Sequence, residues 1–439
     1  MARLFQPLPI GRGGRELPNR IWLPAMVTWR STDEGVVTDA VRDIYVRYAQ
    51  GGAGMIVLEA MGIRDIASGP LLRLSDDRYV PGLKHLVDEL RRAAAFPSLF
   101  VPQIIDFLKI STRKPTRAFF EGAVKRGQLG AEVLALSDDE LLAQAPSLLS
   151  PRLLHDLRFG YRQTIADLDR SEIARIPDWF AQAARRAQQA GFDGVELHFA
   201  HAYTMASFLS VTNQRTDEYG GSLTNRLRLP REVIEAVRGA VGREFVVGCR
   251  YLGAEDIALA DGTVGGNTVE DAAAIGVALC DAGLDFLSVS RGGKFDDAKQ
   301  PAVGESAYPY TGPSGHACIP RRKSDLPGVN AHLAATIRAA VRAAGHDVPV
   351  VTAGKIFRFA QAEQLLSDGK ADLIGMARAL LADPDLPRKW LGGQDAAVTE
   401  CVFCPYCEQE DQHHRTVTCT LWPRLPGTKL HAIPPVWRP

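Results

Sequence analysis

The sequence predicts a (β/α)8 TIM barrel, an α/β fold in which eight parallel strands alternate with helices. Short β-rich runs alternate with Ala-, Leu- and Arg-rich helical segments along most of the 439 residues. Several runs are apolar nearly throughout, as expected for parallel strands buried on both faces. No G-x-G-x-x-G follows any run, which disfavours the alternative, an open doubly wound sheet. The predicted strands are 21–25, 54–59, 98–103, 194–198, 245–250, 286–290, 348–352 and 372–375.

Helical patterns separate these runs, and three of them end in Ala-Gly just before the next strand, at residues 190–191, 282–283 and 344–345. Glycine directly after a helix favours a left-handed C-cap, so these pairs indicate helix ends. The predicted helices are 177–189, 230–240, 268–282, 331–344 and 360–367.

The composition is that of an ordinary globular protein, with 46% apolar and 23% charged residues. Lys+Arg and Asp+Glu both total 51, so there is no basic excess for a nucleic acid or a membrane surface. No run of about 18 apolar residues could span a bilayer, and the first residues lack the apolar core of a signal peptide. We therefore expect a cytoplasmic protein without nucleic-acid or membrane partners, and homo-oligomerisation stays open.

Two connections that follow strands are unusually long. An insertion of roughly residues 106–170 follows the third strand, and a Gly- and Pro-rich loop, about 291–330, follows the sixth. Loops at the C-terminal ends of barrel strands build the active-site rim, so both are predicted to be lids or substrate walls. A surface decoration or a dimer arm is the alternative. The predicted domains are a barrel over residues 1–395 and a cysteine-bearing extension over 396–439, with no NAD(P)- or FAD-binding domain after it.

The fourth predicted strand ends in a cluster of reactive side chains, His198, His201 and Tyr203, in the run His-Phe-Ala-His-Ala-Tyr. Barrel enzymes carry their catalytic residues at this end of a strand. Histidines can donate hydrogen bonds to a carbonyl or nitro oxygen, and a tyrosine hydroxyl can deliver a proton to carbon. One histidine alone would be taken as an ordinary polar residue at a strand end. The three together predict a catalytic site.

Residues 198–226 resemble the Old Yellow Enzyme family of FMN-dependent ene-reductases, whose usual wording is H-G-A-H-G-Y…F-L-S-P…N-x-R-x-D-x-Y-G-G-S-x-x-N-R. The resemblance covers most of the chain. It includes Leu-Pro-Asn-Arg at 17–20, Leu-Pro-Ala-Met at 23–26, Ala-Gln-Gly-Gly-Ala-Gly at 49–54 and Gly-Met-Ala-Arg-Ala-Leu-Leu-Ala-Asp-Pro-Asp at 375–385. It implies an FMN-dependent oxidoreductase, for which NADH, NADPH and a redox protein all stay open as the electron donor.

The resemblance also implies a role for each matching residue. His198 and His201 would hold the activating oxygen of the substrate, and Tyr203 would donate the proton. The implied flavin-binding residues are Pro24, Ala25 and Met26 beside the isoalloxazine, Ala60 from the second strand, Gln103 at the pyrimidine, Arg250 at the N1/O2 edge, and Gly354, Lys355, Gly375 and Arg378 around the phosphate. The loops after the last two strands of such barrels commonly bind phosphate, and Arg378 would supply charge-assisted bonds there.

The chain departs from the family wording at several places near the expected site, among them the residues after Gln103, where Ile104-Ile105-Asp106 lacks the usual His, and Ala202, which replaces a glycine. Val27 stands where many members carry Thr or Cys, with Thr28 one position later. Phe199 replaces a glycine of the catalytic motif and is expected to add bulk near the substrate. Flavin tuning and substrate choice are therefore expected to differ from those of other members.

Four of the seven cysteines form the pattern Cys401-x2-Cys404-x2-Cys407-x11-Cys419. Such a cluster in a cytosolic chain favours a metal centre over disulfides. The spacing alone fits both an iron–sulfur cluster and a tetrahedral zinc site, and two nearby histidines at 413–414 support the zinc alternative.

The family resemblance bears on this choice. Its iron–sulfur branch, like 2,4-dienoyl-CoA reductase and trimethylamine dehydrogenase, carries a similar cysteine run just after the barrel. This implies a [4Fe–4S] cluster held by the four cysteines, which would exchange electrons with a separate donor or acceptor protein.

Three functions follow from these features. The first is reduction of an activated C=C bond of enone, enoate or dienoyl type, with hydride from FMN N5 to the β-carbon and a proton from Tyr203 to the α-carbon. The second is oxidation of an amine or another C–N substrate, which needs an aromatic or acidic pocket that the sequence does not locate. The third is an electron-transfer flavoprotein without a substrate of its own. The first is the leading interpretation, and the intact His-x-x-His-x-Tyr argues against the third.

Overall fold

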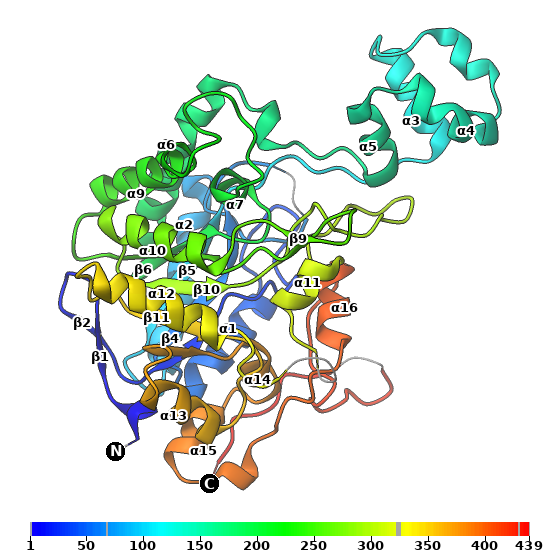
Figure 1. Ribbon diagram of the computed structural model, residues 1–439. Helices are drawn as coiled ribbons and strands as arrows, with labels where there is room; N and C mark the ends of the chain where they lie inside the picture. The colour runs from blue at the N-terminus through cyan, green and yellow to red at the C-terminus, as the bar shows by residue number, and fades with distance from the viewer. Residues whose placement is uncertain (1, 67–68, 322–325, 429–430, 439) are drawn as a thin grey trace.

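The computed structural model describes residues 2–66, 69–321, 326–428 and 431–438. Eight parallel strands form a closed barrel in which each strand pairs with the next along the chain and the last pairs with the first (Figure 1). The barrel strands are β3 (Ile21–Leu23), β4 (Met55–Gly62), β5 (Leu99–Ile105), β6 (Gly194–Phe199), β7 (Val246–Leu252), β10 (Leu287–Ser290), β11 (Val350–Ala353) and β12 (Leu373–Gly375). Each predicted strand is one of these, so the predicted (β/α)8 fold is confirmed.

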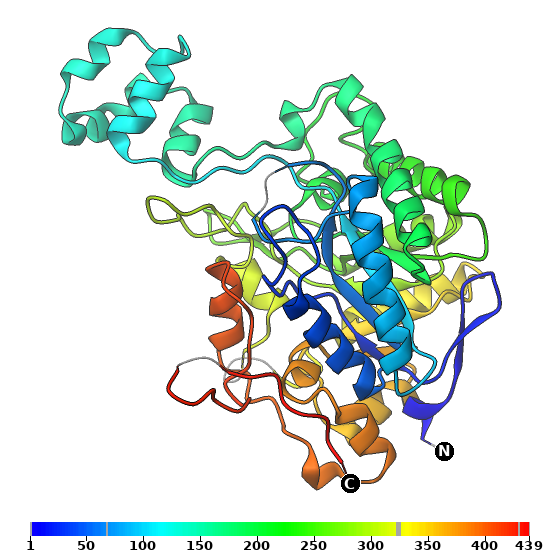
Figure 2. The same cartoon turned by 180° about the vertical axis from the view of Figure 1, so that it is seen from behind.

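Helices surround the barrel and bury one apolar face each against it (Figure 2). Gly191, Gly283 and Gly345 have φ values of +86°, +110° and +86°, which confirms the predicted left-handed helix ends. The helices that follow the strands are α1 (Asp39–Gly51), α2 (Val80–Ala93), α6 (Arg170–Gln189), α9 (Arg228–Val241), α10 (Val269–Asp281), α12 (Ala331–Ala343), α13 (Phe359–Ser367), α14 (Ala377–Ala382) and α15 (Leu386–Leu391).

Helix α6 begins at Arg170, well before the predicted start at Pro177. Asp169 accepts a hydrogen bond from the Glu172 backbone, and the Glu172 side chain accepts one from the Asp169 backbone. This capping box fixes the true start, while Pro177 lies inside the helix.

The inside of the barrel is filled with apolar side chains and is closed at the N-terminal ends of the strands. A hairpin of β1 (Leu8–Ile10) and β2 (Arg15–Leu17) packs Ile10 and Leu17 into this inner core. Above them the rings of Trp22 and Phe286 meet edge to face at 4.8 Å. The barrel can therefore open to a ligand at the C-terminal ends of its strands.

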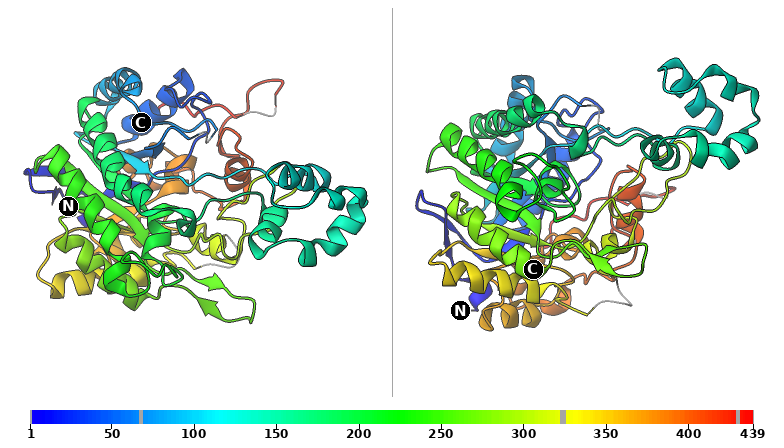
Figure 3. Two further views of the ribbon diagram at one scale, coloured as in Figure 1. Left: turned by 90° about the horizontal axis from the view of Figure 1, so that it is seen from above. Right: turned by 45° about the horizontal axis from the view of Figure 1, so that its top comes forward.

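The insertion after β5 forms an arm that extends away from the barrel, as Figures 1, 2 and 3 all show. Its helices pack around a small core of their own. They are α3 (Thr116–Lys125), α4 (Asp138–Leu148) and α5 (Pro151–Phe159), with a 3-10 turn at Ala131–Ala135. The two ends of the insertion run antiparallel, because Ser111 N donates to Tyr161 O at 2.8 Å and Gln163 N donates to Lys109 O at 2.7 Å. We call this paired segment, residues 109–111 and 161–163, the stalk.

Short elements fill the other connections. They are α7 (Thr204–Leu209), α8 (Leu223–Arg226), the hairpin of β8 (Ile257–Ala258) and β9 (Val264–Gly265), α11 (Pro313–Cys318), α16 (Tyr406–Gln412) and 3-10 turns at Arg3–Phe5, Asp77–Tyr79, Ile165–Asp167 and Asp395–Ala397. Within the described ranges, no helix combines the length and the apolar character needed to cross a bilayer.

A buried ion pair attaches the C-terminal tail to the barrel. Arg47 of α1 and Asp385 are 6% and 2% exposed and form two hydrogen bonds with each other. Arg47 also donates to the carbonyl oxygens of Pro434 and Pro435, and Asp385 accepts from Trp437 N. One pair thus connects α1, the loop after α14 and the tail.

Replacing Arg47 with alanine is expected to lower the free energy of unfolding by about 3–5 kcal/mol, because it leaves the Asp385 carboxylate buried without its partner. Arg42→Ala on the same helix is the matched control. Arg42 is 34% exposed and pairs with Asp39 and Glu89, so about 1 kcal/mol or less is expected there. Denaturant titration of both variants measures the difference, and equal losses would contradict the prediction.

Candidate active site

A cavity of about 450 Å³ lies at the C-terminal ends of the barrel strands. Every residue that the sequence singled out for catalysis or flavin binding lines it. These residues are Pro24, Ala25, Met26, Ala60, Gln103, His198, His201, Tyr203, Arg250, Gly354, Lys355, Gly375 and Arg378. The barrel thus brings together residues that are scattered over most of the chain.

The two histidines form a connected pair at the end of β6. Positive φ values at His201 and Ala202, +57° and +62°, turn the chain so that both rings and Tyr203 face the same cavity. His201 Nδ1 lies 3.4 Å from His198 Nε2, and His201 Nε2 lies 2.7 Å from Ser290 Oγ. Ser290, at the end of β10, was not predicted. Its only sequence signal is its place at the end of a barrel strand.

Both histidines are neutral at physiological pH. Burial, reinforced by the positive charge of Arg250, lowers the pKa of His198 and His201 well below the ordinary value. A neutral ring keeps one N–H donor. Nδ1 of His198 is buried and has no hydrogen-bond partner among the described residues. The pair therefore has donor capacity to offer to a bound oxygen without carrying a charge of its own.

Tyr203 lies beside the histidines in an apolar setting. Its ring centre is 5.8 Å from that of His198, and Phe107 and Phe295 contact it edge to face at 5.1 and 6.0 Å. Burial raises the pKa of Tyr203. The hydroxyl group therefore stays protonated at physiological pH and can serve as a proton donor.

Arg250 and Gln103 form the polar part of the cavity floor. Arg250 donates to Ala25 O at 3.3 Å, and its Nε is buried with no partner in the described part of the chain. Gln103 Nε2 donates to Glu196 Oε1 at 2.6 Å. Burial raises the pKa of Glu196 to about 7, while the charge of Arg250 opposes the shift. A fixed amide and a cation with spare donors fit the polar edge of a flavin ring.

The opposite end of the cavity suits a phosphate group. Gly354 has φ +131°, and a Cβ there would lie 2.7 Å from Asn330 Nδ2, so no other residue fits without strain. A Cβ on Gly375 would lie 3.0 Å from the Cβ of Ala353. Lys355 and Arg378 line the cavity beside these glycines. Open backbone flanked by two cations fits the phosphate of FMN.

The outer wall is aromatic and acidic, which the sequence did not reveal. Asp411 of α16 accepts hydrogen bonds from Trp29 Nε1 at 2.8 Å and from Tyr308 Oη at 2.6 Å. Burial raises the pKa of Asp411 to about 6, although both hydrogen bonds oppose the shift. The wall also contains Tyr310, whose ring lies 5.3 Å from that of His201. These residues come from three distant segments, and no motif connects them.

The structure corrects one expectation and clarifies another. Phe199 is 1% exposed, packs edge to face on Phe180 at 6.2 Å and does not line the cavity, so the expectation that it adds bulk near the substrate is wrong. Side chains alternate along a strand, and Phe199 faces the helix layer. Val27 lines the cavity, whereas Thr28 donates to buried Glu59 at 2.7 Å. The Thr28 hydroxyl therefore does not take the place of the Thr or Cys side chain that many family members carry at the position of Val27.

The two long loops contribute differently to the cavity. The 291–330 loop supplies walls, as predicted, through Phe295, residues 306–310 and residues 318–320. Only the base of the insertion lines the cavity, through Phe107, Leu108 and Ile110. Its helices lie beyond the barrel (Figure 3).

The four cysteines of the extension line a small cavity together with Arg378, which we call the cysteine cavity. Burial raises the pKa of Cys407 to about 12. Over the described ranges, no group of three or more His, Cys, Asp or Glu residues is placed to hold a metal ion. His413 and His414 do not line this cavity, and His414 stacks on Trp29 at 4.2 Å instead.

Known proteins resemble this chain over nearly its whole length. The sequence model of the NADH:flavin oxidoreductase / NADH oxidase family matches residues 3–395. A metal reductase of Desulforamulus reducens is 32% identical over 406 residues, which are 92% of this chain and 51% of that protein. A cinnamate reductase of Clostridium sporogenes is 27% identical over 439 residues, 98% of this chain and 59% of that protein. The chain thus spans little more than half the length of these curated relatives.

A similar solved structure supports the same fold. The complex of 2-naphthoyl-CoA reductase with 2-naphthoyl-CoA matches with a TM-score of 0.70 and 23% identity, covering 96% of this chain and 57% of that one. At this identity the likeness concerns the fold.

Proposed function

The chain belongs to the NADH:flavin oxidoreductase / NADH oxidase family, the predicted Old Yellow Enzyme family, and is a flavin-dependent oxidoreductase; from this premise we propose that it reduces an activated C=C bond. The observation that carries the proposal is the neutral histidine pair next to a protonated tyrosine in one cavity. A relative named cinnamate reductase adds support.

The proposed reaction assigns a part to the flavin, to the histidine pair, to Tyr203 and to Ser290. When bound, FMN supplies a hydride to the β-carbon of the double bond. The histidine pair donates a hydrogen bond to the activating carbonyl oxygen through His198, whose Nδ1 has no other partner among the described residues, and stabilises the negative charge that develops on it. His201, bonded to His198 and Ser290, holds the ring of His198 in place. Tyr203 gives its hydroxyl proton to the α-carbon. Hydride and proton together account for the two electrons and two hydrogens added across the bond. Ser290 positions the ring of His201.

The cysteine cavity is our proposed site for a [4Fe–4S] cluster. Four thiols of one extension line it, and the two histidines that would favour zinc lie elsewhere. Arg378 lines both this cavity and the proposed phosphate site, so the two cofactor sites would share a wall. NAD(P)H would reduce the flavin, and the cluster would exchange electrons with a separate redox protein.

Amine oxidation is the second candidate, because the outer wall provides what the sequence did not locate. The Asp411 carboxyl group, whose pKa burial raises to about 6, is largely ionised at neutral pH. It lies among the rings of Trp29 and Tyr308. A carboxylate among aromatic faces favours a protonated amine.

One anaerobic experiment separates these functions. We expect the reduced holoprotein to be reoxidised on mixing with cyclohexenone, seen as return of the flavin absorbance, and not on mixing with cyclohexanone. Bleaching of the oxidised flavin by a primary amine, with no response to the enone, would favour the second candidate instead. Reoxidation by redox proteins alone would overturn both and support an electron carrier.

A further inference from the structure

A second cavity of about 460 Å³ adjoins the active site. It shares four wall residues with the first cavity: Leu108, Ile110, Tyr203 and Phe295. Tyr203, the proposed proton donor, therefore stands between the two spaces. A substrate whose double bond lies at Tyr203 can place its remaining part in this second cavity.

Arg162 gives the second cavity a positive charge that has no ion-pair partner among the described residues. Its guanidinium lies 4.3 Å from the centre of the Phe295 ring and forms no hydrogen bond or ion pair with any residue in the described ranges. Burial lowers the pKa of Arg162, and the carboxylates of Asp296 and Asp156 oppose this shift without forming an ion pair with the guanidinium. A partly buried cation without an ion-pair partner is unfavourable, and a bound anion would compensate it.

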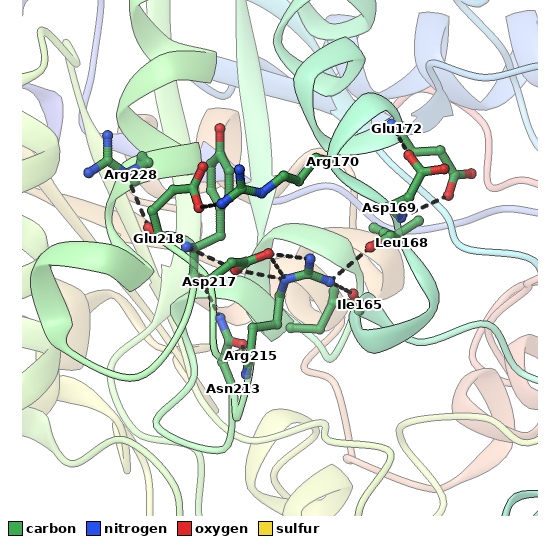
Figure 4. A network of polar contacts seen from close by, with 11 residues as sticks. Ile165, Leu168, Asp169, Arg170, Glu172, Asn213, Arg215, Asp217, Glu218 and Arg228 are labelled. Atoms are coloured by element: carbon green, nitrogen blue, oxygen red, sulfur yellow. Dashed lines mark hydrogen bonds and ion pairs between the residues drawn. The ribbon is translucent and has the colours of Figure 1, made fainter.

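The other cations of this cavity are already paired. Arg215 bonds Asp217 and the carbonyl oxygens of Ile165 and Leu168, as Figure 4 shows. Lys294 pairs with buried Glu255 at 3.4 Å. Among the described residues that line the cavity, Arg162 is thus the cation available to a ligand.

The stalk holds Arg162 in place before any ligand arrives. Its backbone pairs with that of Ile110, and its carbonyl oxygen accepts a hydrogen bond from Arg152 at 2.6 Å. The Phe295 ring that supports the guanidinium also contacts the Tyr203 ring at 6.0 Å. The insertion therefore supplies a cation that rests on the same ring as the proton donor.

We propose that the second cavity is an anion subsite of the substrate, in which Arg162 binds a carboxylate or phosphate group carried beyond the reacting double bond. The inference rests on the proposed function and narrows its substrate class to anionic molecules. It also gives the insertion a role, because the stalk supplies the anchoring residue.

Equilibrium binding to the oxidised holoprotein tests the subsite without turnover. The probes are a cyclohexanone that carries a short alkyl carboxylate and the methyl ester of the same compound, followed by the shift in flavin absorbance. We expect the carboxylate to bind about 10- to 100-fold more tightly than the ester. Arg162→Met should abolish this preference and leave the affinity for the ester unchanged, while Arg162→Lys should keep part of it.

Arg158→Met is the matched control, because Arg158 is an exposed arginine of α5 on the same arm. It should bind both probes like the unchanged protein. Competition by free coenzyme A identifies a phosphate-bearing substrate, and competition by simple carboxylates alone identifies a free acid; either supports the subsite. Equal affinity for acid and ester in the unchanged protein would overturn it, as would an equal loss of both in Arg162→Met.

The binding test of the anion subsite and the turnover test of C=C reduction can fail independently of each other. Preference for the carboxylate without flavin reoxidation by any enone would retain the subsite and reject C=C reduction. Turnover of enones without any preference for the acid would do the reverse.

Discussion

Replacing Tyr203 with phenylalanine is expected to slow reduction of an enone by about 10²- to 10⁴-fold while the flavin is still reduced by NAD(P)H at nearly its normal rate. The substitution removes the hydroxyl proton and keeps the ring, which packs between Phe107 and Phe295. Rapid mixing measures the two half-reactions separately, so that a loss confined to the second one identifies the proton-transfer step.

Tyr310→Phe is the matched control for this prediction. Tyr310 lines the same cavity and contacts His201, but the proposed mechanism assigns no proton to it. Its variant should change either half-reaction far less. Unchanged rates in both half-reactions of Tyr203→Phe would contradict the donor role, and equal losses in the two variants would show a general effect on the cavity.

The pH dependence follows from the direction of the Tyr203 shift. Because burial raises the pKa of Tyr203, the hydroxyl stays protonated up to at least its ordinary value of about 10. Titration of Tyr203 should therefore not lower the rate of the oxidative half-reaction between neutral pH and about pH 9. A fall centred near neutrality would point to another proton donor.

The barrel could be predicted because its signal is local. Strands such as β4 and β5 are buried along their whole length, so each is a nearly continuous apolar run, interrupted only by Glu59 and Gln103 respectively. Glycines such as Gly191 mark the helix ends through a conformation that other residues seldom adopt. The error at α6 was avoidable, because the capping box at Asp169 was present in the sequence.

The outer parts of the site could not be predicted, because they depend on contacts between distant segments. Asp411 meets Trp29 only after the extension folds across the barrel mouth. Ser290 reaches His201 only once β10 and β6 share a barrel. No sequence motif includes Arg162. Its guanidinium stands out only in the structure, because it forms no ion pair with any described residue. Phe199 was misplaced because a motif position does not show which face of the strand a side chain takes.

The same contacts connect the extension to the active site. Helix α16 carries Cys407 near its start and Asp411 in its last turn. It therefore joins the cysteine cavity to the outer wall of the active site. A group bound by the cysteines would hold in place the helix that positions the Asp411 carboxylate.

Changing Cys404 to serine is expected to remove the proposed cluster altogether. Cys404 lines the cysteine cavity, and loss of one of four thiolate ligands leaves an iron site open to solvent. Anaerobically purified Cys404→Ser should lose its brown absorbance and fall from ~4 iron atoms per chain to nearly none, while the flavin bands stay. Cys318→Ser is the control, since Cys318 lines the flavin cavity and lies outside the extension.

Full iron content in Cys404→Ser would show that Cys404 is not a ligand, and zinc without iron in the unchanged protein would establish the zinc alternative.

The link through α16 adds a second readout. Without the cluster, the hydrogen bonds of Asp411 to Trp29 and Tyr308 should loosen, so ligands that contact the outer wall should bind more weakly. The affinity for FMN should hold, because Gly354 and Arg250, at the two ends of its site, lie on barrel strands or directly after them. If FMN and the ligands of the outer wall both lost affinity by the same factor in Cys404→Ser, the cluster would support the whole mouth of the barrel.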